Sequence, residues 1–267
     1  MSRYRSSEEI SVNQRSSAAC FSGQGDCVEE YSELIGETPE WVQSSRLDLA
    51  DLGGSGAELS TGLILTWHEK LVFGLEPRAI PLGAQGQPGI AAFVGIGGHL
   101  DPGERWGDAV LREALEEASC PVSLGDSPIT YLCRQDRPPC PIAYSWRESN
   151  RPLLVWVATF ELRRGPDQRR VPVTLVNAVF RAAALGRPSP GAEIQALLTM
   201  DQDALLYTYH KPRPFGELLD RGAGLIGNPI PLDTLVAPGG SAYFYAQWLA
   251  WQDEMPMDAV NDPDPGD

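Results

Sequence analysis

The sequence predicts one α/β or α+β domain with a sizeable core, and two observations support this. Segments with strand and helix patterns alternate over about 190 residues, which argues against an all-α or all-β fold. The chain has 267 residues, of which 42% are hydrophobic and 21% charged. This length and composition suit a globular protein with one large domain, or one domain with extensions.

Charge and apolar run lengths limit the partners of the chain. The net charge is −15 and the isoelectric point is near 4.6, which argues against a broad basic face for nucleic-acid polymers. A small anionic substrate remains compatible with this net charge, since a metal ion and a few arginines can make the electrostatic potential of a binding site positive. The longest apolar run, LLVWVATFEL, is shorter than the roughly 20 residues that span a bilayer. No membrane partner is therefore expected.

Cysteine usage and the start of the chain predict a cytoplasmic protein. The five cysteines form no CxxC pair and are odd in number, which favours reduced thiols over a disulfide framework. The first residues, MSRYRSSEEISVNQRSS, contain no apolar stretch of the kind found in a secretory signal.

Residues 1–57 are predicted to be an N-terminal extension that is partly disordered. Residues 1–27 are rich in Ser, Gln and charge and indicate a flexible arm. The segment TPEWVQSSRLDLADL follows, where Thr38 could cap a short helix and Pro39 could take its first position. The sequence GGSG at 53–56 is typical of a linker.

The elements of the domain follow from residue 58 onward. TGLILTW and KLVFGLE flank His68 and Glu69 and predict a hairpin. Four further strands are expected, at GIAAFVGI, ITYLCRQ, LLVWVATFEL and EIQALLT. Helical spacing predicts helices at VTLVNAVFRAAAL and at SAYFYAQWLAWQ. The domain is expected to end near residue 252, and the acidic, proline-rich tail at 253–267 to be disordered.

The most informative segment is GIGGHLDPGERWGDAVLREALEEASC, residues 95–120. At about 100° per residue, Glu113, Glu116 and Glu117 share one side of a helix. The opposite side carries Val110, Leu111, Ala114, Leu115 and Ala118. These positions predict an amphipathic helix with its aliphatic stripe in the core and its acidic face outward.

Two interpretations of the acidic face are open. It is a solvated charged surface, as on many helices, or it binds a cation. Like charges at i,i+3 and i,i+4 destabilise a helix, and Mg²⁺ would remove that repulsion because it prefers carboxylate and carbonyl oxygens. The loop before the helix suits a metal or phosphate. Gly97 and Gly98 permit close backbone approach, and the turn at 101–103 brings Glu104 towards the helix start.

The spacing of these residues resembles the Nudix box. That pattern is Gly, five residues, Glu, seven residues, Arg-Glu, an aliphatic residue, any residue, Glu-Glu, any residue, Gly and an aliphatic residue. All six strict positions up to the last glutamate match, at Gly98, Glu104, Arg112, Glu113, Glu116 and Glu117. Ser119 stands in place of the usual glycine, which predicts a strained or shifted helix end costing about 1 kcal/mol. Ala114 and Cys120 are small for the aliphatic positions, and Ile96 replaces a common proline.

The resemblance implies an α/β fold, a Nudix-like α/β/α sandwich with a mixed β-sheet, over residues 58–252. It also implies Mg²⁺-dependent hydrolysis, with Mn²⁺ as the alternative ion, of a small-molecule nucleoside diphosphate linked to another group. The alternative is a Nudix-fold sensor that binds a nucleotide metabolite without cleaving it. Many members of the family are dimers, so the sequence leaves a homodimer open.

The resemblance also implies roles for single residues. Glu116, Glu117, Glu113 and the Gly97 carbonyl are expected to bind the metal. Glu113, Glu104 and Arg112 form the expected catalytic group, in which a glutamate orients water and the arginine holds a glutamate. Family members often add an acidic residue from a later loop, and Glu193 and Asp201 are the two candidates.

Substrate recognition is predicted in RQDRPPCPIAYSWRESNRP, residues 134–152, which joins two strands. Tyr144 and Trp146 could stack on a base, and Arg134 and Arg147 could pair with phosphate. An ordinary surface loop is the equally weighted alternative. His99 could touch a phosphate or be a plain loop residue, and no zinc-binding spacing is present.

Overall fold

The computed structural model describes residues 49–80, 90–135, 137–142, 144, 146–164, 169–191 and 193–254. The expected flexible arm, most of the expected helix at 38–52 and the tail from residue 255 lie outside these residues. The described chain starts with the 3₁₀ helix η1 (Leu49–Gly53), whose Leu49 is buried in the core. The domain boundaries drawn from the sequence stay predictions.

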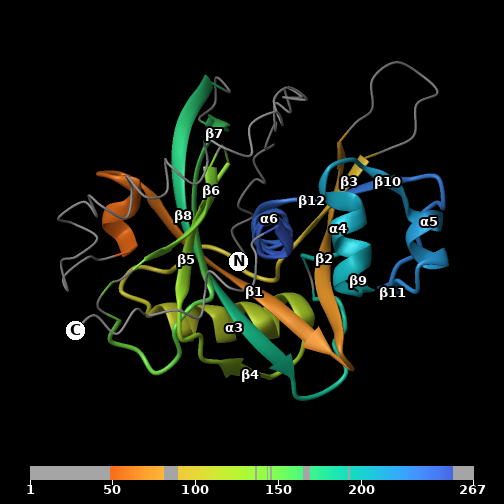
Figure 1. Cartoon of the computed structure of the whole chain (residues 1–267), viewed down its shortest axis with the longest axis horizontal. Helices are drawn as coiled ribbons and strands as arrows, with labels where there is room; N and C mark the ends of the chain where they lie inside the picture. Colours follow the sequence, from red (N-terminus) through yellow and green to blue (C-terminus); the bar gives the residue numbers. More distant parts are fainter. Residues whose placement is uncertain are drawn as a thin grey trace, which may run out of the picture.

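A mixed β-sheet forms the centre of the molecule (Figure 1). Its strands are β1 (Glu58–Trp67), β2 (Lys70–Ile80), β3 (Ile90–Val94), β4 (Val122–Gly125), β5 (Thr130–Arg134), β6 (Arg137–Ile142), β7 (Leu154–Arg164), β8 (Arg169–Ala184), β9 (Ala196–Met200), β10 (Arg213–Pro214), β11 (Gly224–Gly227) and β12 (Leu235–Pro238). The main order is β10-β12-β3-β2-β1-β8-β7-β5-β6, with β4 beside β8, and β9 between β2 and β11. The pairs β1–β8, β5–β7 and β3–β12 are parallel and the others antiparallel. The α/β class with a mixed sheet is confirmed.

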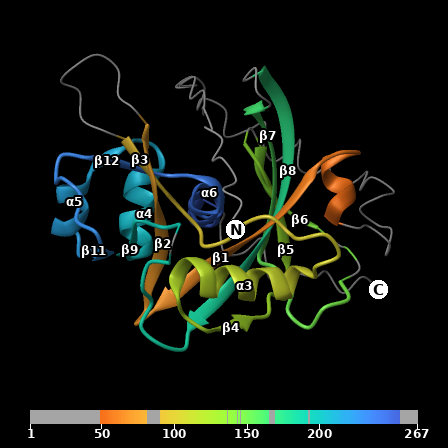
Figure 2. The ribbon, with the colours of Figure 1, turned by 180° about the vertical axis from the view of Figure 1, so that it is seen from behind.

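Helices cover both faces of the sheet. They are α3 (Trp106–Ala118), α4 (Gln202–Tyr209), α5 (Phe215–Asp220) and α6 (Gly240–Glu254). In Figures 1 and 2, α6 lies on one face of the twisted sheet, between the strands β2 and β3 and the strands β5 to β8. The helix α3 lies on the opposite face, along β1. Leu63 and Leu65 of β1 join the core under α3, whereas Ile64 joins the core under α6. This alternation is what a strand buried on both faces produces.

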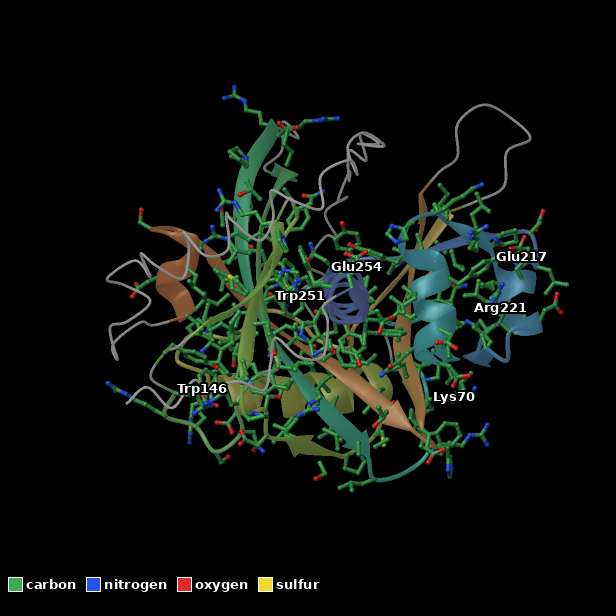
Figure 3. The ribbon with its side chains drawn as sticks, viewed as in Figure 1. Lys70, Trp146, Glu217, Arg221, Trp251 and Glu254 are labelled. Atoms are coloured by element: carbon green, nitrogen blue, oxygen red, sulfur yellow. The ribbon has the colours of Figure 1, made fainter. Side chains whose placement is uncertain are left out.

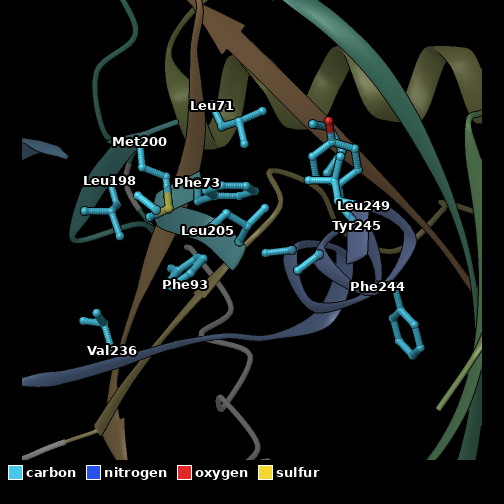
Figure 4. Packing of buried hydrophobic residues seen from close by; sticks show 14 of the residues in the cluster. Leu71, Phe73, Phe93, Leu198, Met200, Leu205, Val236, Phe244, Tyr245 and Leu249 are labelled. Carbon is cyan, nitrogen blue, oxygen red and sulfur yellow. The ribbon is translucent and has the colours of Figure 1, made fainter. Parts of the chain in front are cut away.

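The larger core lies between the sheet, α4 and α6. Figure 4 shows Phe73 and Phe93 of the sheet near Leu205 of α4. Phe244 lies on the other side of α6, where it stacks on Trp156 of β7. The aromatic C-terminal helix therefore contributes to the core, as its composition indicates. No helix among the described residues is long and apolar enough to cross a membrane.

Most elements expected from the pattern are confirmed. The hairpin β1–β2 turns at His68 and Glu69, whose φ angles of 47° and 64° match a two-residue turn with two left-handed residues. The strands expected at GIAAFVGI, ITYLCRQ, LLVWVATFEL and EIQALLT correspond to β3, β5, β7 and β9, and the last expected helix to α6.

The helix predicted at VTLVNAVFRAAAL is wrong, because this segment forms most of β8. It pairs in parallel with β1 and antiparallel with β7, so both of its edges are hydrogen-bonded within the sheet. Val176 and Phe180 pack into the core under α3, and Val179 packs into the core under α6. A strand buried on both faces has a near-continuous apolar sequence without alternation. The two-residue period that identifies a strand was therefore missing from this segment.

The predicted orientation of α3 is also wrong in part. Leu111 and Leu115 are 39% and 55% exposed, whereas Glu113 is only 8% exposed. The buried face therefore includes Val110 and Ala114 as predicted. It also includes Glu113, whereas the two leucines that were expected in it are exposed. The cause is the loop before α3, which packs over this side of the helix and covers Glu113.

The end of α3 shows the strain expected from Ser119. This residue is left-handed, with φ 47° and ψ 34°, and its N–H bonds to the Ala114 carbonyl. Glycine adopts this conformation without the steric cost that a Cβ brings. We expect Ser119→Gly to raise the free energy of unfolding by about 1 kcal/mol, measured by urea denaturation. Ser123→Gly, in the exposed part of β4, is the control and should lower it by about 0.5–1 kcal/mol. A Ser119→Gly protein no more stable than the wild type would contradict this account.

Candidate active site

The loop before α3 is fixed to β1 by backbone hydrogen bonds. The Thr61 N–H donates to the Gly98 carbonyl at 2.8 Å, and the Leu63 N–H donates to the Ile96 carbonyl at 2.6 Å. A Cβ at Gly97 would overlap the Thr61 carbonyl. The glycine thus permits the close approach to β1, and the loop is held in one place beside α3.

One arginine lies among the carboxylates of the predicted site. Arg112 donates to both oxygens of Glu104 at 2.9 Å. Its Nη1 donates to Glu113 at 2.7 Å and to Glu116 at 3.0 Å, and its Nη2 donates to the His99 carbonyl at 3.1 Å. We call Glu104, Arg112, Glu113, Glu116 and Glu117 the acidic cluster. The guanidinium group of Arg112 relieves the repulsion between these carboxylates, in addition to what solvent or a metal ion could do.

The carboxylates of the cluster differ in environment. Burial raises the pKa of Glu113 against the opposing effect of Arg112, and the charges of Glu116 and Glu193 add to the rise. The hydrogen bonds from Arg112 hold the pKa of Glu104 below its ordinary value. Glu117 accepts the Gly97 N–H at 2.8 Å, and a Cβ at Gly98 would overlap the Glu113 carboxylate. Gly97 therefore bonds directly to Glu117, and Gly98, which lacks a side chain, lets Glu113 pack against the loop.

The start of α3 is capped by a residue that the sequence analysis missed. Glu148 accepts the N–H groups of Trp106 at 3.1 Å and Gly107 at 2.7 Å. These are two of the N–H groups that a helix start leaves without an intrahelical partner, and a carboxylate there is also favoured by the helix dipole. No local signal marks Glu148, because it lies 41 residues from Gly107 in the sequence.

The other end of α3 is held by the loop that follows β8. The Gly191 N–H donates to the Glu117 carbonyl at 2.7 Å, and the Ser189 N–H donates to the Ala118 carbonyl at 2.9 Å. These bonds satisfy carbonyls that have no partner within the helix. They also attach the loop carrying Glu193 to the helical turn that carries Glu116 and Glu117.

The two later acidic candidates are placed differently. Asp201, which directly precedes α4, forms a 2.6 Å ion pair with Lys70 of β2. Glu193 lies in the loop whose Gly191 bonds to the Glu117 carbonyl, and its charge is among the causes that raise the pKa of Glu113. Glu193 is therefore the candidate that the structure brings to the acidic cluster.

Tyr144 and Trp146 pack against the core below α3. The Tyr144 hydroxyl lies 2.8 Å from Thr130 Oγ1, and burial raises its pKa to about 12. Trp146 lies near the start of α3 in Figure 3, and its Nε1 donates to the Asn150 carbonyl at 2.7 Å. These contacts are those of packed aromatic residues, and the predicted stacking of a base on them remains a prediction.

The predicted substrate loop at 134–152 is only partly a loop, because residues 137–142 form β6 and pair with β5. Arg134 lies at the end of β5, where its carbonyl accepts a hydrogen bond from Gln247 of α6. Arg147 is exposed, next to the capping Glu148. Phosphate binding by Arg134 and Arg147 remains a prediction, as does a phosphate contact for His99, which lies 3.2 Å from Glu58.

Among the residues that the structure describes, no group of three or more His, Cys, Asp or Glu side chains is arranged to hold a metal ion. The chemistry of the donors nevertheless suits a hard divalent cation, because all of them are carboxylate or backbone oxygens. The side chain of Glu116 is 59% exposed, so it can leave Arg112 without opening the core.

Comparison with known proteins gives partial likenesses. No family model matches the chain, and no curated protein matches it. A Nudix-family hydrolase from Clostridium perfringens is 16% identical, with a TM-score of 0.38, over 58% of this chain and 87% of that one. A Nudix hydrolase from Nitrosomonas europaea is 14% identical, with a TM-score of 0.33, over 79% and 99%. A MutT protein from Methanosarcina mazei is 12% identical, with a TM-score of 0.36, over 60% and 87%. At these values the likeness assigns no activity and no residue role to this chain.

Proposed function

We propose that the protein hydrolyses a phosphoanhydride in a nucleoside diphosphate linked to another group, with Mg²⁺ or Mn²⁺ as cofactor. One observation carries this proposal. The residues at the six strict positions of the box lie together. Glu104, Glu113 and Glu116 surround Arg112, and Glu117 accepts a hydrogen bond from Gly97, in the loop that contains Gly98. A solvated helix face would not require a buried glutamate and a glycine loop packed on it.

The residues that would hold the cation are Glu116, Glu117 and the Gly97 carbonyl, with Glu113 beside them. A bound divalent ion neutralises charge on the diphosphate and lowers the pKa of its water. Arg112 fixes Glu104 and Glu113 by direct hydrogen bonds, and the Gly97 N–H fixes one oxygen of Glu117. Carboxylates held in this way are preorganised. Glu104, Glu113 and Glu193 are the groups available to take the proton of the attacking water, and cleavage releases two phosphorylated products.

The test is a substrate panel of ADP-ribose, dinucleoside polyphosphates, nucleoside triphosphates and sugar nucleotides, assayed with Mg²⁺, Mn²⁺ or EDTA. We expect metal-dependent release of a nucleoside monophosphate from at least one class. Glu117→Gln keeps an oxygen for the Gly97 N–H but removes the charge, and should lower kcat at least about 100-fold. Glu161→Gln, at an exposed ion pair with Arg170, is the control. Equal turnover by wild type and Glu117→Gln would refute the assignment.

A nucleotide sensor without catalysis is the second candidate, and the Arg112 contacts favour it. Three carboxylates of the cluster are already paired with this arginine, so the arrangement is stable without a cation. A sensor would show thermal stabilisation by a nucleotide of the panel and no product on chromatography with either metal. Product formation by the wild type would exclude it.

A further inference from the structure

We propose that a hollow beside the acidic cluster binds the uncharged nucleoside half of the substrate. The hollow is lined by residues 190, 191 and 193–195 and by Gly227 and Asn228, and its volume is about 510 Å³. We call it the side hollow. Ligand sites commonly measure about 300–1,000 Å³. The inference rests on the proposed function, because it assigns a place to one half of the proposed substrate.

The side hollow adjoins the turn of α3 that carries two of the expected metal ligands. Its wall residue Gly191 bonds to the Glu117 carbonyl at 2.7 Å. The same glycine packs so closely on the Glu116 carbonyl that a Cβ would overlap it. Glu193, also in the wall, lies two residues after Gly191 in the same loop. A substrate with its diphosphate at the acidic cluster would therefore have the side hollow within reach of one end.

The two walls of the side hollow are joined by backbone contacts. The Asn228 N–H donates to the Gln195 carbonyl at 3.3 Å, and Gly227 pairs with Ala196 across β11 and β9. Gly227 has φ 111°, and a Cβ there would lie 2.6 Å from Pro190. The shape is thus set before a ligand arrives, which lowers the ordering cost of binding.

The lining chemistry selects an uncharged group. None of the residues that line the side hollow is Lys, Arg or His, and one of them is the carboxylate Glu193. Phosphate would be repelled there, whereas the hydroxyl groups of a ribose can donate to a carboxylate. The side-chain amides of Gln195 and Asn228 each offer a donor and an acceptor. Both residues are exposed, and their amides make no hydrogen bond to any other part of the described chain. Two adjacent amides of this kind complement the polar edge of a nucleobase.

The experiment measures binding apart from turnover. Adenosine, guanosine, cytidine and uridine are titrated without metal into wild type, into the double variant Gln195→Ala/Asn228→Ala, and into Gln252→Ala, an exposed control on α6. Ligand-observed NMR supplies the dissociation constant. We expect at least one nucleoside to bind the wild type and the control equally, and the double variant at least 10-fold more weakly. Ribose 5-phosphate should bind more weakly than that nucleoside.

Steady-state kinetics separates this inference from the proposed function. With a hydrolysed nucleotide, the double variant should raise KM at least 10-fold and leave kcat within a factor of about three. Nucleoside binding that depends on the two amides, without hydrolysis of any substrate, would sink the proposed function and leave the side hollow assigned. Hydrolysis with an unchanged KM, no nucleoside binding to the wild type, or equal binding by the double variant would each overturn the inference.

Discussion

Arg112→Ala is expected to lower the free energy of unfolding by about 3 kcal/mol and to abolish hydrolysis. The side chain of Arg112 is 29% exposed and pairs with three carboxylates, of which the side chain of Glu113 is 11% exposed. Removing one member of a largely buried ion pair leaves a charge without compensation, which costs about 3–5 kcal/mol. We take the lower value because Glu116 can turn to solvent. Arg112→Lys should lie between wild type and alanine, since an ammonium cannot reproduce the planar fork that bonds both oxygens of Glu104.

Urea denaturation of the two variants, with Arg105→Ala as control, measures this effect. Arg105 is exposed and directly precedes α3, so its loss should change stability by less than about 0.5 kcal/mol. Because a cation and the guanidinium neutralise the same carboxylates, Mg²⁺ should stabilise Arg112→Ala more than the wild type. If Arg112→Ala unfolds together with Arg105→Ala, the arginine does not hold the cluster together. If Mg²⁺ stabilises the wild type more than Arg112→Ala, the arginine positions the carboxylates for the cation and does not compete with it.

Sequence periodicity located the acidic cluster because its members lie close together along the chain. Glu113, Glu116 and Glu117 share a helix side at a spacing set by helix geometry, and Glu104 is only eight residues from the arginine that binds it. The hairpin at His68 and Glu69 was found for the same reason, since a two-residue turn is a local feature. The pairing of Arg112 with three glutamates was only partly foreseen, as one such contact was expected.

Non-local contacts explain what the pattern missed. The sequence of β8 does not alternate between apolar and polar residues, because helices cover both faces of the sheet. The sequence of one segment does not reveal such covering. The side of α3 that is buried depends on the loop 97–99, and the cap of the same helix comes from Glu148, in a separate loop. Glu193 and Asp201 looked equivalent in the sequence. The structure separates them, because Asp201 pairs with Lys70 at 2.6 Å whereas the loop carrying Glu193 is hydrogen-bonded to the end of α3.

Gly191→Ala should be among the most damaging single changes outside the acidic cluster. A Cβ at this position would overlap the Glu116 carbonyl, a backbone atom that cannot swing aside as a side chain does. The loop would have to leave α3 and give up the bonds from Gly191 to Glu117 and from Ser189 to Ala118. Overpacking and two lost backbone hydrogen bonds together cost about 2–4 kcal/mol. The same shift would move Glu193 away from Glu113 and lower hydrolysis in the part of the protein that stays folded.

Gly186→Ala is the matched control, because it changes the same residue type in the same loop. A Cβ at Gly186 would meet only the Cys120 sulfur, at 3.9 Å, which is an ordinary contact. Its stability should stay within about 0.5 kcal/mol of wild type, or rise slightly because alanine restricts the unfolded chain. Thermal and urea unfolding distinguish the two variants. Equal Tm values for Gly191→Ala and Gly186→Ala would show that the loop after β8 is not fixed to α3, and Glu193 would then have no defined position beside the acidic cluster.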